Sequence, residues 1–179
     1  MSINEIMNVE DLKILIRDVP DFPKPGISYK DITTLLKSPM GLKSTISAML
    51  EPFAGVDIEL VVGIESRGFI LAAPMAIQLG CGFIPVRKPG KLPAATLRQE
   101  YDLEYGSDAI EIHADAVSAG QKVLLVDDVL ATGGTLAASC QLLKNLGADI
   151  VGVSVLAELG FLQGRERLPD CRLESLIVY

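Results

Sequence analysis

The stretch from Val123 to Thr135, VLLVDDVLATGGT, constrains the fold more than any other part of the chain. Its first four residues, Val123 to Val126, are all apolar, which is typical of a strand buried on both faces of a parallel sheet. Two adjacent acids, Asp127 and Asp128, come next, so we expect them at the carboxyl end of that strand. In open α/β sheets, ligands bind in the crevice outside this end. The stretch therefore predicts a parallel α/β fold with a ligand site beside the acids.

A Thr-Gly-Gly-Thr turn comes shortly after the acids. Gly133 and Gly134 let the backbone turn tightly and approach a ligand closely, and Thr132 and Thr135 add hydroxyl groups. Apolar residues near helical spacing over 135–146 place this turn at a helix N-terminus, where unpaired N–H groups and the helix dipole favour an anion. Adjacent acids repel each other without benefit in a purely structural turn, whereas a sugar needs acceptors for its hydroxyl groups. The sequence therefore predicts a site for a phosphorylated sugar.

Two better-known phosphate motifs are excluded at this turn. The glycine pair and Thr135 are followed by Leu136, so the Lys-Ser or Lys-Thr of a Walker A loop is missing. The spacing also differs from the GxGxxG fingerprint of dinucleotide-binding folds. The alternative without a ligand is a strand, a polar turn and a capped helix.

A second strand, turn and helix are expected earlier in the chain. The apolar run Ile58 to Ile64 predicts a strand, and Phe69 to Leu79 predicts a helix. Between them lies Glu65-Ser66-Arg67-Gly68. A guanidinium such as that of Arg67 can bind a phosphate with two parallel hydrogen bonds, although a surface salt bridge is the alternative. Both turns should open on the same edge of the sheet.

Composition limits the classes of function. With 179 residues, 49% hydrophobic and 22% charged, the chain is predicted to be one globular domain. Its apolar runs are too short to cross a bilayer and its N-terminus lacks a signal-peptide pattern, so we expect a cytoplasmic protein without a membrane partner. The three cysteines form no CxxC pair, which argues for reduced thiols and against zinc. The net charge of -7 disfavours nucleic acid, whereas the local cations Arg87, Lys88, Lys91 and Arg98 favour a small polyanion.

The remaining patterns complete a parallel sheet flanked by helices. A Pro- and Gly-rich stretch, Asp21 to Lys30, is expected to be irregular but packed, because it also carries apolar side chains. A hairpin is expected from Thr96–Tyr105 and Asp108–His113, and it would form a lid. The other expected elements are helices at Val9–Arg17 and Ser38–Phe53 and strands at Phe83–Val86, Asp149–Leu156 and Arg172–Tyr179.

VLLVDDVLATGGT resembles the phosphoribosyl pyrophosphate signature of type I phosphoribosyltransferases, and the chain from about Val19 onward is similar to members of that family that act on adenine. The resemblance implies transfer of the phosphoribosyl group of phosphoribosyl pyrophosphate to adenine, giving AMP and pyrophosphate. It implies Mg²⁺ carried by phosphoribosyl pyrophosphate, with no direct protein ligand for the metal. It also implies a homodimer of single-domain chains (1–179), in which 1–35 contribute to a hood over the base and 87–113 form a basic loop and a lid.

The resemblance further implies roles for individual residues. Catalytic roles would fall on Arg67, Asp127, Asp128 and Glu104, the last being the acid near the purine. Substrate-binding roles would fall on Ser28, Tyr29, Lys30, Glu65, Ser66, Arg87, Lys88, Lys91, Tyr105, Ala131, Thr132, Gly133, Gly134, Thr135 and Leu159. Two of these depart from the family, which commonly has Phe at the position of Tyr29 and Arg at that of Lys30.

Three alternatives stay open at this point. A phosphoribosyltransferase for another purine would keep the central turn and differ in the hood. A non-catalytic regulator that senses phosphoribosyl pyrophosphate would need a DNA-binding appendage, for which length and charge leave no room. A nucleotide-binding domain with a structural role would release no pyrophosphate when both substrates are mixed.

Overall fold

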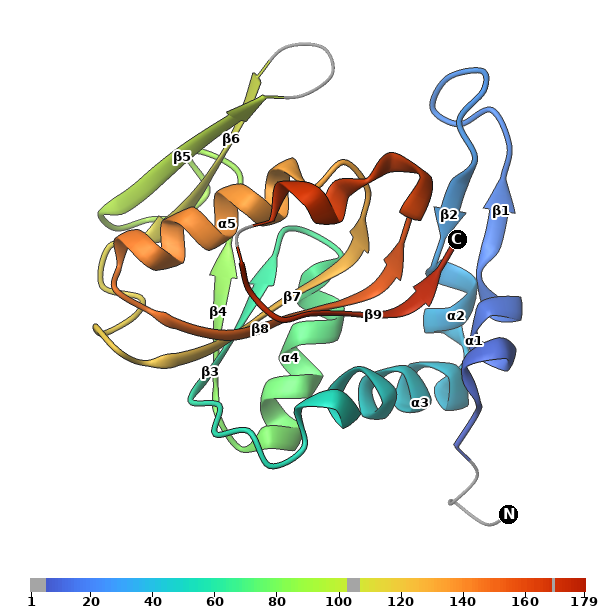
Figure 1. The fold of residues 1–179 in the computed structure, drawn as a ribbon, viewed down its shortest axis with the longest axis horizontal. Helices are drawn as coiled ribbons and strands as arrows, with labels where there is room; N and C mark the ends of the chain where they lie inside the picture. The colour runs from blue at the N-terminus through green and yellow to red at the C-terminus, as the bar shows by residue number, and fades with distance from the viewer. Residues whose placement is uncertain (1–5, 103–106, 169) are drawn as a thin grey trace.

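A computed structural model describes residues 6–102, 107–168 and 170–179 as a three-layer α/β structure (Figure 1). Across these residues, no helix is both long enough and apolar enough to cross a membrane. The helices and strands, in chain order, are α1 (Val9–Leu15), β1 (Arg17–Val19), β2 (Tyr29–Asp31), α2 (Thr33–Lys37), α3 (Pro39–Leu50), β3 (Leu60–Ile64), α4 (Gly68–Leu79), β4 (Gly82–Val86), β5 (Thr96–Asp102), β6 (Ser107–His113), β7 (Lys122–Leu130), α5 (Gly134–Asn145), β8 (Asp149–Glu158) and β9 (Leu173–Val178).

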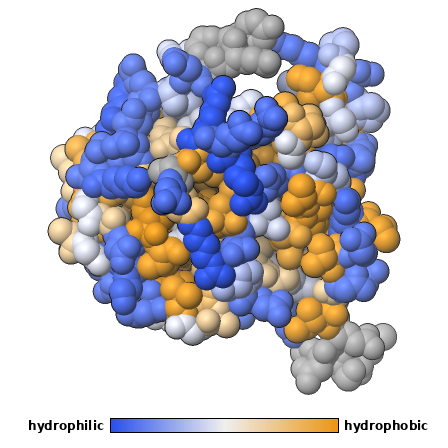
Figure 2. All heavy atoms as spheres, viewed as in Figure 1, coloured by the Kyte–Doolittle hydropathy of each residue, from blue (hydrophilic) through white to orange (hydrophobic). Residues whose placement is uncertain are grey.

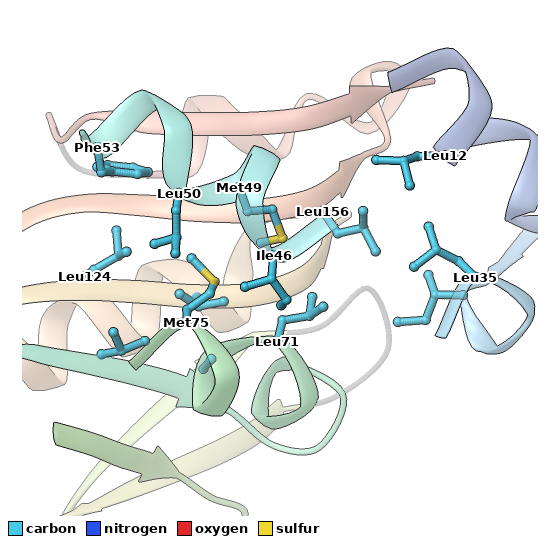
Figure 3. Packing of buried hydrophobic residues seen from close by; sticks show 14 of the residues in the cluster. Leu12, Leu35, Ile46, Met49, Leu50, Phe53, Leu71, Met75, Leu124 and Leu156 are labelled. Atoms are coloured by element: carbon cyan, nitrogen blue, oxygen red, sulfur yellow. The ribbon is translucent and has the colours of Figure 1, made fainter. Parts of the chain in front are cut away.

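The central sheet has the order β4-β3-β7-β8-β9, and each neighbouring pair is parallel. Strand β7 lies in the middle and is buried on both faces, as its apolar run predicts. Leu124 and Val126 pack into one core cluster with α3 and α4 (Figure 3), while Val123 and Leu125 pack into a second cluster with α5 and β6. The predicted parallel sheet flanked by helices is therefore confirmed.

Strand β7 extends further than its sequence indicated. We expected Asp127 and Asp128 at its carboxyl end, but this expectation is wrong, because the strand runs on to Leu130. Pairing with β8 holds the extra residues in place, with Val129 opposite Ala157 and Leu130 opposite Glu158. Both acids therefore lie on a rigid strand, and the Thr-Gly-Gly-Thr turn begins after it.

The N-terminal region contains regular structure that the sequence did not predict. Strands β1 and β2 pair antiparallel, with Val19 opposite Tyr29, and form a small hairpin beside the carboxyl end of the sheet (Figure 1). The short helix α2 follows directly and buries Leu35 in the first core cluster. Strands of only three residues are too short to show periodicity, and proline and glycine dominate the loop between them. The expected irregular segment is thus confined to the loop of this hairpin.

The hairpin that the sequence predicted is confirmed as β5 and β6. Its strands pair from Thr96 opposite His113 to Asp102 opposite Ser107. Its base is part of the core, because Ile110 and Ile112 are buried in the second cluster. The backbones of Arg87 and Glu111 also hydrogen-bond to each other, which joins the hairpin to the end of β4. Hydrophilic side chains cover the hairpin's outer face, at the upper left of Figure 2. The base of this hairpin is therefore fixed to the sheet.

Candidate active site

A small cavity lies at the junction of β7 and α5, which we call the phosphate corner. Its volume is about 80 Å³, and it is lined by Asp127, Val129, Leu130, Ala131, Thr132, Gly133, Gly134, Thr135 and Leu136. Gly133 caps α5 with φ 83°, in the left-handed region that favours glycine. The first N–H groups of α5 consequently border the cavity without intrahelical partners, as anion binding requires.

The two acids of β7 differ in their surroundings. Asp127 is half-buried and lines the phosphate corner, whereas Asp128 is buried and lies against Arg67. Burial, and then the neighbouring charge of Asp128, raise the pKa of Asp127 well above its usual range. Burial also raises the pKa of Asp128, although the Arg67 guanidinium opposes that shift. Successive side chains of a strand leave on opposite faces, which explains why adjacent acids have different neighbours.

Arg67 lies at the turn between β3 and α4 and connects three parts of the site. Its Nε is 2.7 Å from Asp128 Oδ2, and its Nη1 donates to the hydroxyl group of Tyr29. Its guanidinium carbon also lies 5.1 Å from the centre of the Tyr29 ring. Because the Arg67 side chain is still 30% exposed, the guanidinium can reach a bound anion.

A larger cavity of about 300 Å³ lies under the N-terminal hairpin, and we call it the base cavity. It is lined by Ile27, Ser28, Tyr29, Lys30, Arg67, Val129, Ala131, Leu159 and Leu162. Its size is at the lower end of the range for small-molecule sites, and its lining is mostly apolar, as such sites usually are. Val129 and Ala131 also line the phosphate corner, so the two cavities adjoin at the end of β7.

Adjacent residues of β2 face different surroundings at the base cavity. Tyr29 packs its ring edge-on to Phe22, with the ring centres 5.2 Å apart. The Lys30 ammonium group instead pairs with Asp18 and lies 4.0 Å from the centre of the Tyr179 ring. The charge of Lys30 is therefore engaged by Asp18 and Tyr179.

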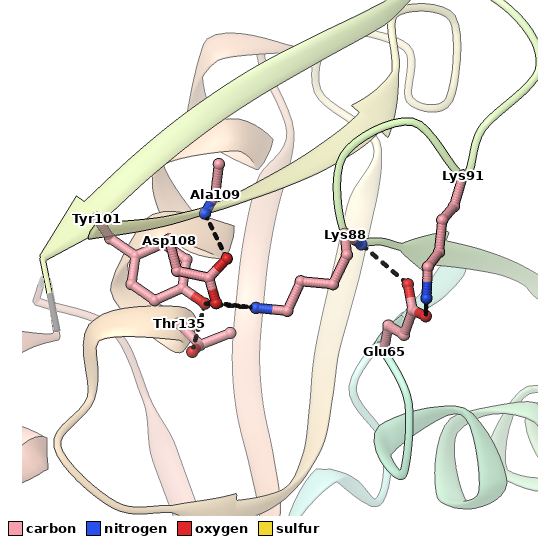
Figure 4. Close-up of polar contacts among 7 residues, drawn as sticks. All are labelled: Glu65, Lys88, Lys91, Tyr101, Asp108, Ala109 and Thr135. Carbon is pink, nitrogen blue, oxygen red and sulfur yellow. Dashed lines mark hydrogen bonds and ion pairs between the residues drawn. The ribbon is translucent and has the colours of Figure 1, made fainter. Parts of the chain in front are cut away.

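The basic loop after β4 carries Arg87, Lys88 and Lys91, and all three cations contact carboxylates. Glu65 accepts a hydrogen bond from Arg87 Nε at 3.2 Å. It also accepts hydrogen bonds from the Lys88 backbone N–H at 2.9 Å and from Lys91 Nζ at 2.5 Å (Figure 4). Partial burial of Glu65 opposes the effect of these bonds, but together they lower its pKa to about 2. Glu65 therefore holds the basic loop against the turn that carries Arg67.

Lys88 extends away from Glu65 toward the phosphate corner. Its ammonium group pairs with Asp108 and donates to the Tyr101 hydroxyl group at 3.0 Å. The same hydroxyl group accepts a hydrogen bond of 3.2 Å from Thr135 Oγ1 (Figure 4). This network joins the hairpin, the basic loop and the first turn of α5. Neither Tyr101 nor Asp108 was predicted, because only the paired register of β5 and β6 brings them together.

The structure brings most of the predicted site residues to one edge of the sheet. Ser66 follows Glu65 through a cis peptide bond, and its carbonyl oxygen accepts a hydrogen bond from Phe69 N at 3.3 Å. Glu104 and Tyr105 lie outside the described residues. Leu162 and Gly164 were missed; nothing in the local sequence signals their contacts with the two cavities.

The site offers few direct ligands for a metal. Among the described residues, no three His, Cys, Asp or Glu side chains gather as a metal-binding group. Mg²⁺ normally keeps several waters and binds one or two carboxylates together with substrate phosphates. Asp127 lines the phosphate corner with Asp128 adjacent in sequence, so the residues present fit a magnesium ion that arrives with a polyphosphate.

Comparisons with known proteins agree with this geometry. The family model for the phosphoribosyl transferase domain matches residues 28–177. The adenine phosphoribosyltransferase of Acaryochloris marina is 60% identical over 169 residues, which cover 94% of this chain and 99% of that protein. The crystal structure of the adenine phosphoribosyltransferase of Rhodothermus marinus matches with a TM-score of 0.92 and 52% identity, over 96% of this chain and 98% of that one.

A further structure, the adenine phosphoribosyltransferase of Saccharomyces cerevisiae, was determined with adenine and an imino-altritol bisphosphate bound. It matches with a TM-score of 0.89 and 39% identity, over 94% of this chain and 97% of that one. The family model spans both turns and the β5–β6 hairpin, and the two relatives each cover more than 90% of the chain. The chain therefore belongs to the phosphoribosyltransferase family, among its adenine phosphoribosyltransferases.

Proposed function

We propose that this chain transfers the phosphoribosyl group of phosphoribosyl pyrophosphate to adenine, giving AMP and pyrophosphate. The observation that carries this proposal is that an apolar base cavity adjoins a phosphate corner, with Val129 and Ala131 lining both. A nucleoside monophosphate has the same order of parts, since its sugar separates the base from the phosphate. The adenine bound to the Saccharomyces cerevisiae enzyme supports adenine as the base.

The 5-phosphate is assigned to the phosphate corner. Backbone N–H groups from Ala131 to Thr135 bind it at the N-terminus of α5, and the hydroxyl groups of Thr132 and Thr135 assist. Binding at this remote point positions the sugar for attack by the purine nitrogen. Asp127 and Asp128 accept hydrogen bonds from the ribose hydroxyls, and their negative charge stabilises the electron-poor sugar carbon as its bond to pyrophosphate breaks.

The pyrophosphate is assigned to the cations of the first turn and the basic loop. Arg67, Arg87, Lys88 and Lys91 now contact carboxylates, and a polyanion of higher charge competes for them. Arg67 is central, because it can turn from Asp128 toward the leaving group. When bound with the substrate, magnesium offsets the negative charge that develops on the pyrophosphate. Glu65 and Ser66 shape the turn that carries Arg67, and Glu65 also holds the basic loop beside it.

The adenine is assigned to the base cavity. The backbone of Ser28 to Lys30 reads its edge, the Tyr29 ring stacks on one face and Leu159 packs on the other. Closure of the hood and the lid excludes water, which would otherwise capture the cation-like sugar. Glu104 and Tyr105 keep the roles that the family resemblance implies, with Glu104 assisting proton movement on the purine.

The test is an assay for AMP and pyrophosphate with phosphoribosyl pyrophosphate, Mg²⁺ and each of adenine, hypoxanthine, guanine and xanthine. We expect AMP and pyrophosphate in equal amounts with adenine, and far slower turnover with the 6-oxopurines. Faster turnover with a 6-oxopurine would make the chain an enzyme for another purine. Binding of phosphoribosyl pyrophosphate without any product would instead favour a sensor.

We also propose that the enzyme works as a cytoplasmic homodimer. The three cysteines are free thiols, which supports a reducing compartment. Large apolar side chains on α4 and β4, including Ile77 at 82% exposed together with Ile70 and Phe83, supply surface that a second subunit could cover. Light scattering coupled to size exclusion measures the mass, and a monomer at micromolar concentration would contradict the dimer.

A further inference from the structure

Residues 158–165 form a short segment that contacts both cavities. The segment leaves β8 at Glu158 and passes through two 3-10 turns, Gly160–Leu162 and Gly164–Arg167. Leu159 and Leu162 line the base cavity. The Leu159 backbone N–H also donates to Leu130 O at 2.9 Å, so the segment begins against the end of β7.

Gly164 packs the far end of the segment directly against the phosphate corner. A Cβ atom added at Gly164 would lie 2.1 Å from Ala131 O, and one added at Gly133 would lie 2.2 Å from Gly164 O. These values mean that the two backbones touch, with no space for a side chain between them. The position of Gly164 therefore limits where the backbone of the phosphate corner can lie.

An ion pair closes this segment into a loop. Arg165 Nε is 3.1 Å from Glu158 Oε1 and its Nη2 is 2.6 Å from Oε2, the two-bonded geometry of a strong Arg–carboxylate pair. Ser175 Oγ donates to the same carboxylate at 2.5 Å, and Arg165 Nη1 donates to Leu173 O at 3.1 Å. The Glu158 side chain is only 9% exposed, and the hydrogen bonds from Arg165 lower its pKa.

Because the Glu158–Arg165 pair joins the two ends of the segment, it holds the residues at the base cavity and the residue at the phosphate corner at a fixed separation. Without the pair, the segment would keep the backbone hydrogen bonds of Leu159 to Leu130 and of Gly160 to Tyr179 at its start but lose the ion pair at its far end. A buried carboxylate without its partner would also move or draw in water. Either change would shift Leu159 and Leu162 on one side and Gly164 on the other. Neither Glu158 nor Arg165 lines a cavity, so both act through the loop they close.

We propose that Glu158 and Arg165 are positioning residues that couple the base cavity to the phosphate corner. This role rests on the proposed function, because it assigns the two cavities to adenine and to the 5-phosphate. It predicts that breaking one ion pair, remote from both ligands, weakens the binding of both. A residue that only stabilised the fold would lower the melting temperature and leave both affinities unchanged.

The experiment uses the full-length chain with Arg165→Gln, Glu158→Gln and the double variant. Ribose 5-phosphate titrated by calorimetry reports on the phosphate corner without any reaction, and steady-state kinetics give KM for adenine and for phosphoribosyl pyrophosphate. We expect each single variant to weaken ribose 5-phosphate binding and raise both KM values about three- to tenfold, with kcat less affected. The double variant should lose less than the two single losses combined, because it leaves no charge unpaired.

Arg172→Gln is the matched control. Arg172 pairs with the exposed side chain of Glu174 at 2.9 Å on the same C-terminal region and also donates to Pro52 O at 2.6 Å, so it makes contacts of the same kinds as Arg165, but it lies outside residues 158–165 and lines neither cavity. We expect its affinities to equal those of the unaltered chain. Ser175→Ala removes one contact to Glu158 and serves as the milder variant if the others do not fold; it should weaken both ligands slightly.

The proposal is overturned if the variants fold and bind both ligands normally, or if only one ligand is weakened. The proposed function fails in a different way: the unaltered chain would then form no AMP. Ribose 5-phosphate binding can be measured in either case, so the two failures are distinguishable.

Discussion

The two strand-turn-helix units of this protein are built alike but present different groups at their turns. The turn after β7 uses backbone N–H groups at a glycine corner, and its shape is set by backbone contacts with Gly164. The turn after β3 uses side chains, and these already contact partners: Arg67 lies on Asp128 and Tyr29, and Glu65 holds the basic loop. Backbone packing thus sets the shape of the first turn, which we call the rigid corner, whereas the side chains of the second would have to exchange partners to bind an anion.

In the proposed reaction, the two turns would bind different parts of phosphoribosyl pyrophosphate. The group that stays on the sugar throughout, the 5-phosphate, is assigned to the rigid corner, which needs no rearrangement between substrate and product. The group that leaves, the pyrophosphate, is assigned to side chains that can be displaced. Asp128 connects the two turns, since it lies on β7 and contacts Arg67. Changes at the rigid corner should therefore have larger effects than changes at the turn with exchangeable partners.

The largest effect is expected from Gly133→Ala. The new methyl group would lie 2.2 Å from Gly164 O, and the residue would keep a φ of 83° that alanine rarely adopts. We expect kcat/KM for phosphoribosyl pyrophosphate to fall about 1,000-fold in steady-state assays, because the corner must move from its binding geometry. Gly55→Ala is the control, since Gly55 has a φ of 79° with open space around it. Equal losses in both variants would show that backbone strain alone is responsible.

Asp128→Asn tests the connection between the two turns. The substitution keeps the shape of a buried side chain and removes the charge beside Arg67. We expect kcat to fall about 100-fold, because charge that stabilises the reacting sugar is lost. Circular dichroism and thermal melting should show an intact fold, because asparagine fills the same buried space as Asp128. Unchanged kinetics would refute the assignment of Asp128 to the ribose.

The sequence predicted the central elements because their signals are local. Apolar runs gave β3, β7 and β8, and the Thr-Gly-Gly-Thr turn correctly marked the start of α5. The end of β7 was placed too early, because polar residues usually end a buried run and only pairing with β8 shows that the strand continues. The hairpin of β1 and β2 was missed for a similar reason: its three-residue strands depend on their partners.

The features of the site that the sequence did not predict are contacts between residues far apart in the chain. The sequence indicated that Arg67 and Asp128 would each face a ligand, and nothing in it showed that they contact one another. Gly164 lies in a stretch without a motif, and its contact with Gly133 depends on the path of residues 158–165. Apolar patterning reports burial and turn chemistry reports backbone shape, but neither reports which side chains meet across the sheet edge.

Arg67→Lys tests whether the turn after β3 needs the guanidinium group. Arginine contacts Asp128 through Nε and Tyr29 through Nη1, and an ammonium group on a flexible stem cannot hold both at once. We expect KM for phosphoribosyl pyrophosphate to rise about tenfold, with a smaller change in KM for adenine. Arg172→Lys is the control at an exposed pair. Equal increases for both substrates would instead indicate that the base cavity has changed.

The smallest effect concerns stability and comes from Glu65. Hydrogen bonds from the basic loop lower the pKa of Glu65 from 4.5 to about 2, so the folded state binds its proton less readily than the unfolded chain does. The resulting stabilisation is present above about pH 4.5 and is lost as the pH falls toward 2. Because solvent screens this cluster, we expect Glu65→Gln to lower the free energy of unfolding by about 1 kcal/mol at pH 7.

Urea unfolding of the unaltered chain and Glu65→Gln between pH 7 and pH 3 measures this effect. The two curves should approach each other below about pH 4.5, because Glu65 of the unfolded chain then takes up a proton while Glu65 of the folded chain stays charged, which favours unfolding of the unaltered chain. A difference that stays constant with pH would mean that Glu65 stabilises the turn by packing. In that case the basic loop would not be held by charge, and the contrast between a turn with exchangeable partners and a rigid corner would lose its physical basis.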